Sequence, residues 1–454
     1  MFWAVLELLA IGGSIVGLVR GESTLALVSL MLPLHLLLVG LVLRNSFLLL
    51  AFFSVLFPLS SMEFLPHSYR DLGLFIGILG LLLFVVVAES LVGHRGARRG
   101  PGRVVAGLLI LVALAAVTAN AVAYLRGYPG RTADLAALLV VLLTLWLYAV
   151  VPATAKQVRR LAFLVVGAYT VSYLVLPFLL GPAGFLVTQK TFDSLFGRLN
   201  FNLIGMTAAA CTGIMLGSVL DARGWLRVVQ LLAIAVLLTV VLYSKSRGAW
   251  LGVGMAFLYV LARSRSFALL PVVVVLVGIL LSFDVFQFAF RVRAEQTGTD
   301  DPALLGRLLL WRSAWNAFRS NWLFGIGVEN FRYLKYGYGF PVLIDPKRWF
   351  NTHHLFLEQF VSLGAAGGTA FLLLPVLALA RVDRVVRQLA IGPSRGFAIG
   401  VNAGLIAHAS HCLLDTPSWH ASTFVLWGAL IGLALATANV AGGGGDEAVP
   451  ASAR

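Results

Sequence analysis

The sequence predicts an all-α fold, a polytopic transmembrane helical bundle with one large loop outside the membrane. The first observation is composition: 60% of the residues are apolar and 12% are charged, whereas a soluble domain carries about 25% charged residues. The second is that apolar runs such as 104–125 and 134–155 reach the roughly 20 residues that a helix needs to cross a bilayer. The third is that these runs are continuous, which favours helices over the alternating strands of a barrel.

The apolar runs divide the chain into about 14 expected spans. They cover 3–19, 24–43, 46–63, 72–92, 104–125, 134–155, 161–180, 199–220, 226–243, 248–262, 267–283, 355–380, 396–413 and 419–440. The opening run lacks a basic n-region and a cleavage site, so we expect it to be the first span rather than a signal peptide. Residues 1–283 then hold the first eleven spans, 284–352 form a large loop, 353–440 hold the last spans, and 441–454 form a disordered cytoplasmic tail.

Charge predicts the orientation of the spans, because cytoplasmic loops hold the excess of Lys and Arg. With alternating spans, the main basic clusters all fall on one side. They are 95–103, 156–160, 223–227, 263–265 and 381–395. Both termini are then cytoplasmic, and the loop 284–352 faces outward. The formal charge of +15 is spread over short loops, which excludes a nucleic-acid-binding domain because such a domain gathers its charge on one surface.

The outward loop is far longer than a plain connection and rich in aromatic residues, which favours an ordered, functional structure at the membrane interface. Within it, apolar residues recur every three or four positions over 303–319 and predict an amphipathic helix. Gly325 and Gly327 mark the turn that follows this helix.

Two cations and two hydroxyls fall where one expected span ends and the next begins, in the segment Ser244–Trp250. Lys245, Ser246 and Arg247 at the start of a helix predict an anion site, because backbone N–H groups and the helix dipole favour negative charge there. The alternative is that the two cations only extend to the membrane surface.

The predicted loop helix carries a second candidate for anion binding. Arg307 lies one turn before Trp311 on the same face, and Arg312 follows. A planar guanidinium suits bidentate binding of a phosphate. The alternative is a solvated arginine on an interfacial helix.

Histidines form the third and fourth groups. His353 and His354, at the start of a span, suit proton transfer near neutral pH, with a capping or interfacial role as the alternative for each. Neighbouring helical residues point about 100° apart, so the two are poor joint metal ligands. The fourth group is His408, His411, Asp415 and His420: His408 and His411 share a helix face and Asp415 lies one turn further on, for which zinc ligation is one interpretation. We favour a hydrogen-bonded cluster at the outer surface and expect no metal.

Taken in order, three of these segments resemble the motifs of the O-antigen ligase and polymerase superfamily, the WaaL/Wzy-C family. The matching segments are Ser246–Trp250, Arg307–Trp311 with Leu323–Phe331, and His353–Gly364. A further family motif, H-x-x-x-D, is matched by His411–Asp415. The resemblance covers roughly residues 195–435.

The sequence departs from the family's pattern at three positions. His354 stands where the family has Asn, Ser362 where it often has Glu, and Leu323 where proline is usual. The spacing to Gly364 makes His353, rather than its neighbour, the counterpart of the family's essential histidine.

The resemblance implies an inverting, metal-independent glycosyltransferase of the GT-C type that needs no cofactor. Such enzymes sit in the bacterial inner membrane and pass a glycan from an undecaprenyl-diphosphate carrier to a glycan or lipid A-core acceptor on the periplasmic face. It implies that Arg247 and Arg307 stabilise the leaving diphosphate and that His353 accepts the proton of the attacking hydroxyl. Substrate-binding roles are expected for Lys245, Ser246, Trp311, Arg312, His354, His411 and Asp415.

Other functions fit the sequence less well. A transporter or lipid flippase usually shows internal repeats and ionisable residues at mid-membrane, and we find neither pattern. Cell-wall polymerases of the RodA/FtsW kind rely on an acidic residue in an outer loop. Asp300, Asp301 and Asp345 are available, but their surroundings do not resemble that family. The ligase, polymerase and protein-glycosylating branches of the superfamily stay open.

Overall fold

A computed structural model describes most of the chain, and all that follows concerns those residues. They are 46–60, 68–91, 100–129, 132–179, 201–244, 246–264, 302–341, 351–417 and 421–441. The spans expected over 3–19, 24–43 and 267–283 and the tail after residue 441 lie outside the described residues. Within the described ranges the fold is all-α, with 13 α-helices, one short 3₁₀ helix and no strand.

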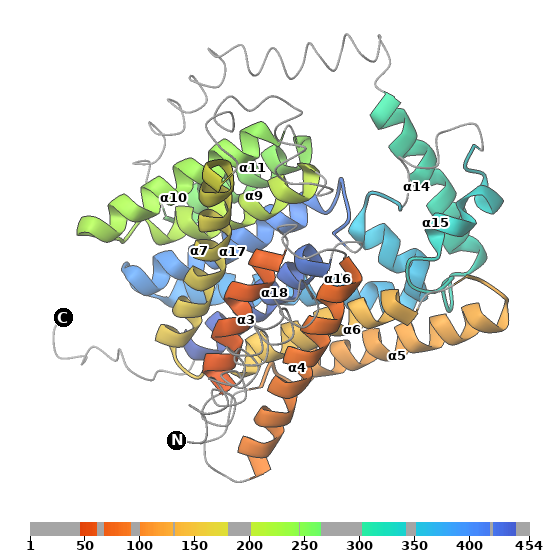
Figure 1. Ribbon diagram of the computed structural model, residues 1–454, viewed down its shortest axis with the longest axis horizontal. Helices are drawn as coiled ribbons and strands as arrows, with labels where there is room; N and C mark the ends of the chain where they lie inside the picture. The colour runs from red at the N-terminus through yellow and green to blue at the C-terminus, as the bar shows by residue number, and fades with distance from the viewer. Residues whose placement is uncertain are drawn as a thin grey trace, which may run out of the picture.

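The helices are labelled in Figure 1. They are α3 (Ser46–Ser60), α4 (Ser68–Leu91), α5 (Arg103–Leu125), α6 (Thr132–Val150), α7 (Ala155–Leu179), α9 (Phe201–Ser218), α10 (Gly224–Tyr243), α11 (Arg247–Ser264), α14 (Pro302–Ser320), α15 (Phe331–Leu334), η3 (Lys335–Tyr338), α16 (Leu355–Gln388), α17 (Pro393–His411) and α18 (Ala421–Ala441).

Five of the described helices are long and apolar enough to cross a membrane, so the predicted multi-pass helical fold is confirmed. The five are Arg103–Leu125, Thr132–Val150, Gly224–Leu242, Leu355–Gln388 and Ser422–Ala441. Shorter apolar helices cover Ser46–Pro58, Phe75–Val87 and Asn202–Ser218. One boundary differs clearly from expectation: α16 continues to Gln388, so that Arg381, Arg384 and Arg387 lie on the helix instead of in a loop.

Close packing between glycines sets the position of α17 beside α9. A Cβ atom on Gly217 of α9 would lie 2.1 Å from the backbone nitrogen of Gly400, and one on Gly213 would lie 2.6 Å from that of Gly404. Small residues let membrane helices approach this closely, since lipid provides no hydrophobic drive for their association. On the α11 side, a Cβ on Gly252 would lie 2.5 Å from the carbonyl oxygen of Ala407. The C-terminal end of α17 is thereby placed next to the start of α11.

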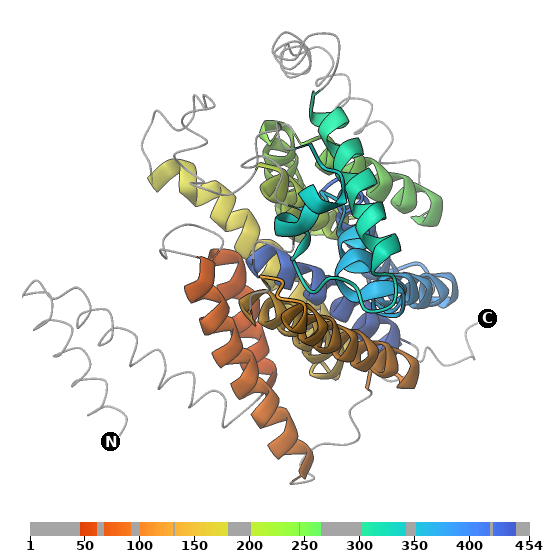
Figure 2. The ribbon, with the colours of Figure 1, turned by 90° about the vertical axis from the view of Figure 1, so that its right-hand side faces the viewer.

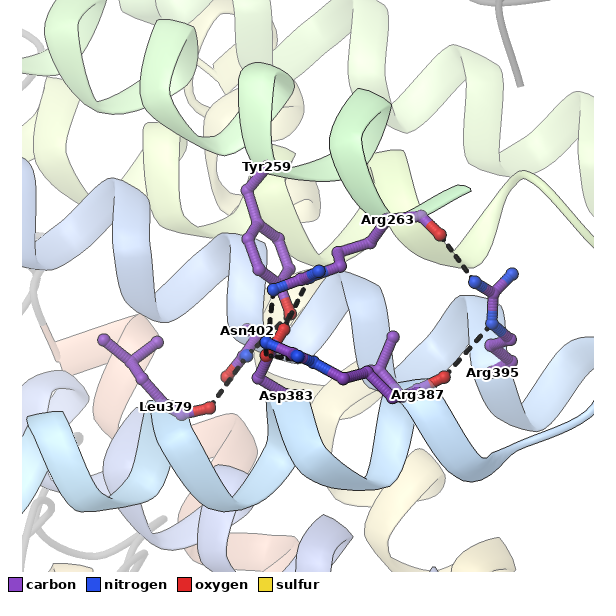
Figure 3. Close-up of polar contacts among 8 residues, drawn as sticks. Tyr259, Arg263, Leu379, Asp383, Arg387, Arg395 and Asn402 are labelled. Carbon is purple, nitrogen blue, oxygen red and sulfur yellow. Dashed lines mark hydrogen bonds and ion pairs between the residues drawn. The ribbon is translucent and has the colours of Figure 1, made fainter. Parts of the chain in front are cut away.

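The C-terminal ends of α11 and α16 and the N-terminal end of α17 meet in a polar cluster (Figure 3). The Asp383 carboxylate accepts hydrogen bonds from Arg263 at 2.9 Å, from Arg387 at 2.8 and 3.0 Å, and from the Tyr259 hydroxyl at 3.1 Å. The Arg395 guanidinium donates to the Arg263 carbonyl at 2.6 Å. We call this the arginine-rich end of the bundle.

Further basic segments reach the same end. Arg381 donates to the carbonyl of Pro101 at 2.6 Å, and Arg159 to the Ser394 hydroxyl at 3.5 Å. Segments that were expected on one side of the membrane from charge alone therefore do lie together. The segments Ser246–Trp250 and His353–Gly364, whose candidate residues we expect to face outward, begin at the other end of α11 and α16.

The predicted amphipathic loop helix is present as α14 and lies at that other end. Figure 1 shows α14 steeply inclined to α5 and α6, and Figure 2 looks onto the same end with α14 in front. Arg126, the residue after α5, donates to the Asn321 side chain at 2.7 Å, and Arg332 pairs with Asp134 at the start of α6. The loop is thus attached to the bundle by charged and polar contacts.

A kink in α16 forms a second attachment for the loop. Gly364 interrupts the helix with φ 71°, a backbone conformation that residues other than glycine rarely adopt. The interruption frees carbonyl groups, and the loop uses them: the Ile326 N–H donates to Val361 and the Gly327 N–H to Ser362, both at 3.0 Å. In return, the Ala365 N–H donates to the carbonyl of Trp322 at 2.7 Å.

Candidate active site

A polar cavity opens where the described parts of α9, α11, α14 and α17 meet. Its lining residues are Asn202, Ser246, Arg247, Gly248, Arg307, His411, Leu414 and Asp415. Arg247 and Arg307, 60 residues apart in the sequence, therefore face one cavity. The structure brings together both guanidinium groups that the sequence singled out.

The start of α11 is shaped by the three residues Ser246, Arg247 and Gly248. The Ser246 hydroxyl accepts the Ala249 N–H at 3.4 Å, as a helix-capping serine does, and contacts His411 Nε2 at 3.1 Å. A Cβ on Gly248 would lie 2.8 Å from the His411 ring, so only glycine leaves room for the imidazole. The helix N-terminus, which favours anions, thus opens into the cavity beside the exposed Arg247.

The turn before α16 holds His353 in an unusual backbone conformation. Its φ is 49°, the left-handed region that a non-glycine residue rarely adopts. The Asn351 side chain accepts the His353 N–H at 3.0 Å, which is an Asx turn. The indole of Trp311 donates to the Thr352 carbonyl at 3.0 Å. Trp311 therefore connects α14, which carries Arg307, to the turn that carries His353.

His353 is joined to the cavity through Asp415. Its Nδ1 lies 2.9 Å from Asp415 Oδ1. Burial raises the pKa of the Asp415 carboxyl, but the neighbouring His353 imidazole and the Thr416 N–H bring it down to about 2. The group is then a carboxylate at neutral pH, and its Oδ1 accepts a hydrogen bond from the Nδ1–H of His353. In this tautomer Nε2 is the basic nitrogen of the ring.

His354 has a different position from its neighbour. Its Nδ1 accepts the Leu357 N–H at 3.2 Å and caps α16. Burial lowers the pKa of the His354 imidazole, which agrees with a neutral ring acting as an acceptor. The ring also packs edge-to-face on Trp311, with centroids 5.8 Å apart. Asn is a preferred capping residue, so a capping role suits both His354 and the Asn that the resemblance leads us to expect at this position.

The remaining predicted residues differ in their relation to the cavity. His411 and Asp415 line it, whereas Arg312 is exposed on α14 and is not among its lining residues. Lys245 lies outside the described residues. His408 is buried and stacks on Trp427, with ring centroids 5.3 Å apart. Among the described residues, no group of three or more His, Cys, Asp or Glu is placed to hold a metal ion.

Sequence reasoning missed three cavity residues, of which Leu414 is an apolar position inside the H-x-x-x-D segment. Asn202 lies in an apolar span, and its isolated amide was the available signal. Gly248 belongs to the segment Ser246–Trp250, whose pattern gives no reason for the absence of a side chain at this position. Its role depends on a contact with His411, 163 residues later in the chain.

Comparison with known proteins supports the assignment of this region. A search of curated proteins found no match. Residues 232–372 match the family described as O-Antigen ligase, Wzy_C. The matched segment contains Arg247, Arg307 and the His353 turn, while Asn202 and Asp415 of the same cavity lie outside it. The chain is a multi-pass helical membrane protein that carries an O-antigen ligase family domain over residues 232–372.

Proposed function

We propose that this protein is a bacterial membrane glycosyltransferase of the O-antigen ligase or polymerase type. It transfers a glycan from an undecaprenyl-diphosphate carrier to an acceptor hydroxyl at the periplasmic face of the inner membrane, with inversion and without a metal. One observation carries the proposal: two guanidinium groups face a single cavity that also contains the carboxylate partner of His353.

Arg247 and Arg307 stabilise the leaving group in this mechanism. When the bond between the anomeric carbon and the phosphate oxygen breaks, negative charge develops on the lipid diphosphate. Fixed cations aimed at that charge stabilise the transition state more than the ground state. The N-terminus of α11 adds its dipole at the same cavity.

His353 acts as the general base. Its Nε2 accepts the proton of the acceptor hydroxyl while the hydroxyl oxygen attacks the anomeric carbon on the face opposite the diphosphate. Asp415, on the Nδ1 side at 2.9 Å, orients the ring and stabilises the imidazolium that forms. The glycan leaves on the acceptor, and the carrier leaves as the diphosphate.

The location of the cavity supports a periplasmic site. Arg263, Arg387 and Arg395 lie at one end of α11, α16 and α17, and the cavity lies at the other. Because cytoplasmic segments hold the excess of Lys and Arg, the cavity end faces away from the cytoplasm. Lipid-linked glycans and membrane lipids are then the partners.

Transfer by the purified protein in proteoliposomes tests the proposal. With a carrier-linked glycan as donor, Arg307→Ala and His353→Ala should abolish transfer while both variants still insert. Wild-type activity in both variants would refute it. A ligase would use lipid A-core as the acceptor, whereas a polymerase would use a second carrier-linked glycan, so separate reactions with each acceptor distinguish the two. Donor that crosses the membrane without elongation would favour a flippase.

A further inference from the structure

A buried carboxylate lies behind the turn that carries His353. Glu358, in the first turn of α16, is only 1% exposed. Its Oε2 accepts the Thr352 N–H at 3.0 Å, six residues back along the chain. It lies outside the cavity lining, and the motifs singled out in the sequence assign no role to this position. Isolated buried carboxylates are costly, so this one needs an explanation.

The turn needs several contacts to keep its shape, because His353 has the disfavoured positive φ. Asn351 contacts the His353 N–H, and Trp311 contacts the Thr352 carbonyl. The bond to Glu358 fixes the other face of the same peptide region, at the Thr352 N–H. The Leu355 N–H, one residue beyond the turn, donates to Cys412 at 2.9 Å and fixes its far end.

The bond from Glu358 is the one contact in this set that is made by a buried carboxyl group. Without it, the Thr352 N–H loses its acceptor, and the turn, held by the remaining contacts of Asn351 and Trp311, can relax toward ordinary backbone conformations. The imidazole would then move away from Asp415, which lies on a different segment and does not follow.

We propose that Glu358 is a positioning residue. By accepting the Thr352 N–H, the side-chain oxygen of Glu358 keeps His353 in the left-handed conformation and the His353 imidazole against Asp415. This inference rests on the proposed function, in which His353 is the base. Glu358 acts through its acceptor oxygen and does not touch substrate.

Replacing Glu358 by Gln and by Ala separates this role from others. Glu358→Gln keeps an acceptor oxygen at the same reach and should retain kcat within about threefold. Glu358→Ala removes the acceptor, and its kcat should fall by about 10- to 100-fold, since a misplacement of about 1 Å at a reacting group costs up to that much. Binding of undecaprenyl diphosphate should stay unchanged in both, because the arginines are untouched.

Gln359→Ala is the matched control, a truncation of a buried side chain at the next position whose Oε1 has no partner among the described residues. It should leave kcat unchanged. Equal losses in Glu358→Gln and Glu358→Ala, full activity in Glu358→Ala, or an equal loss in Gln359→Ala would each overturn the inference.

A second pair of variants keeps the test decisive if Glu358→Ala does not fold. Asn351→Ala removes a different bond of the same turn and should lower kcat, whereas Asn351→Asp keeps the acceptor and should retain it; equal activity in the two would overturn the inference. His353→Ala, measured alongside, distinguishes the two levels of the argument. An active His353→Ala refutes the proposed function, whereas an inactive His353→Ala with an active Glu358→Ala refutes only the role of Glu358.

Discussion

Adding a single methyl group at Gly248 should disable the site while leaving the helix intact. Gly248 is the second residue of α11, and a Cβ there would lie 2.8 Å from His411 Cδ2 and 2.9 Å from Nε2. Ordinary contacts begin at 3.4 Å, so the ring must move by about 0.6 Å, the difference between 3.4 and 2.8 Å. His411 is 1% exposed, so protein atoms surround most of its ring.

The cost of Gly248→Ala can be separated into two opposing terms. Alanine is favoured over glycine in a helix by about 1 kcal/mol. Overpacking a filled interior costs typically about 1–3 kcal/mol. The net change in stability is then between about 0 and 2 kcal/mol, too small to unfold the protein. The movement of His411 breaks its contact with Ser246 and disturbs the cavity, and a shift of this size should lower kcat by about 10- to 100-fold.

Gly254 provides the control on the same helix. A Cβ on Gly254 meets nothing within 4 Å, so Gly254→Ala should keep full activity and gain the helix preference of about 1 kcal/mol. Transfer assays and thermal unfolding of both variants in detergent would test this. Full activity in Gly248→Ala would refute the packing described here, and so would an equal loss in Gly254→Ala.

Three further predictions address other parts of the site. Asp415→Asn should lower kcat by on the order of 100- to 10,000-fold, because the amide no longer fixes the Nδ1–H tautomer of His353, and full activity in this variant would contradict that role. A pH–rate profile of the wild type should show no limb near pH 4, since the Asp415 pKa is about 2. Arg312→Ala should keep kcat within about threefold, because the exposed Arg312 side chain does not line the cavity. A loss of kcat equal to that of Arg307→Ala would show that Arg312 also belongs to the site. Burial lowers the pKa of the Lys335 ammonium from 10.5 to about 8. Between these pH values the unfolded chain binds one proton more than the folded protein, so the free energy of unfolding of the wild type should rise from pH 8 to 10. Lys335→Met should remove that rise, and an unchanged slope in the variant would exclude Lys335 as its source.

The helical architecture was predictable because hydropathy and charge act locally. Continuous apolar runs predicted α5 and α6 within a few residues, and the arginine clusters predicted which helix ends lie together. The amphipathic period of 303–319 predicted α14 for the same reason. These features depend on neighbours along one segment and not on the rest of the fold.

The site was only partly predictable, since its contacts join distant segments. Nothing in the local pattern pairs His353 with Asp415, 62 residues later, or shows that Gly364 interrupts α16 to receive the loop. The spacing to Gly364 selects His353 over its neighbour only through the family resemblance, and the local pattern gives no physical reason for the choice. The structure gives one, because His354 caps the helix and the positive φ of His353 turns its ring to the other side.

The most direct test of the shared site compares binding with turnover in the same three variants. Affinity for undecaprenyl diphosphate would be measured by calorimetry for wild type, Arg247→Ala, Arg307→Ala and His353→Ala in nanodiscs. Each arginine variant should lose at least about tenfold in affinity, as expected for a lost hydrogen bond to a charged group, whereas His353→Ala should bind like wild type and transfer no glycan. Arginine variants that bind normally, or a His353→Ala variant that fails to bind, would contradict the assignment of the cations to the diphosphate and the imidazole to the acceptor.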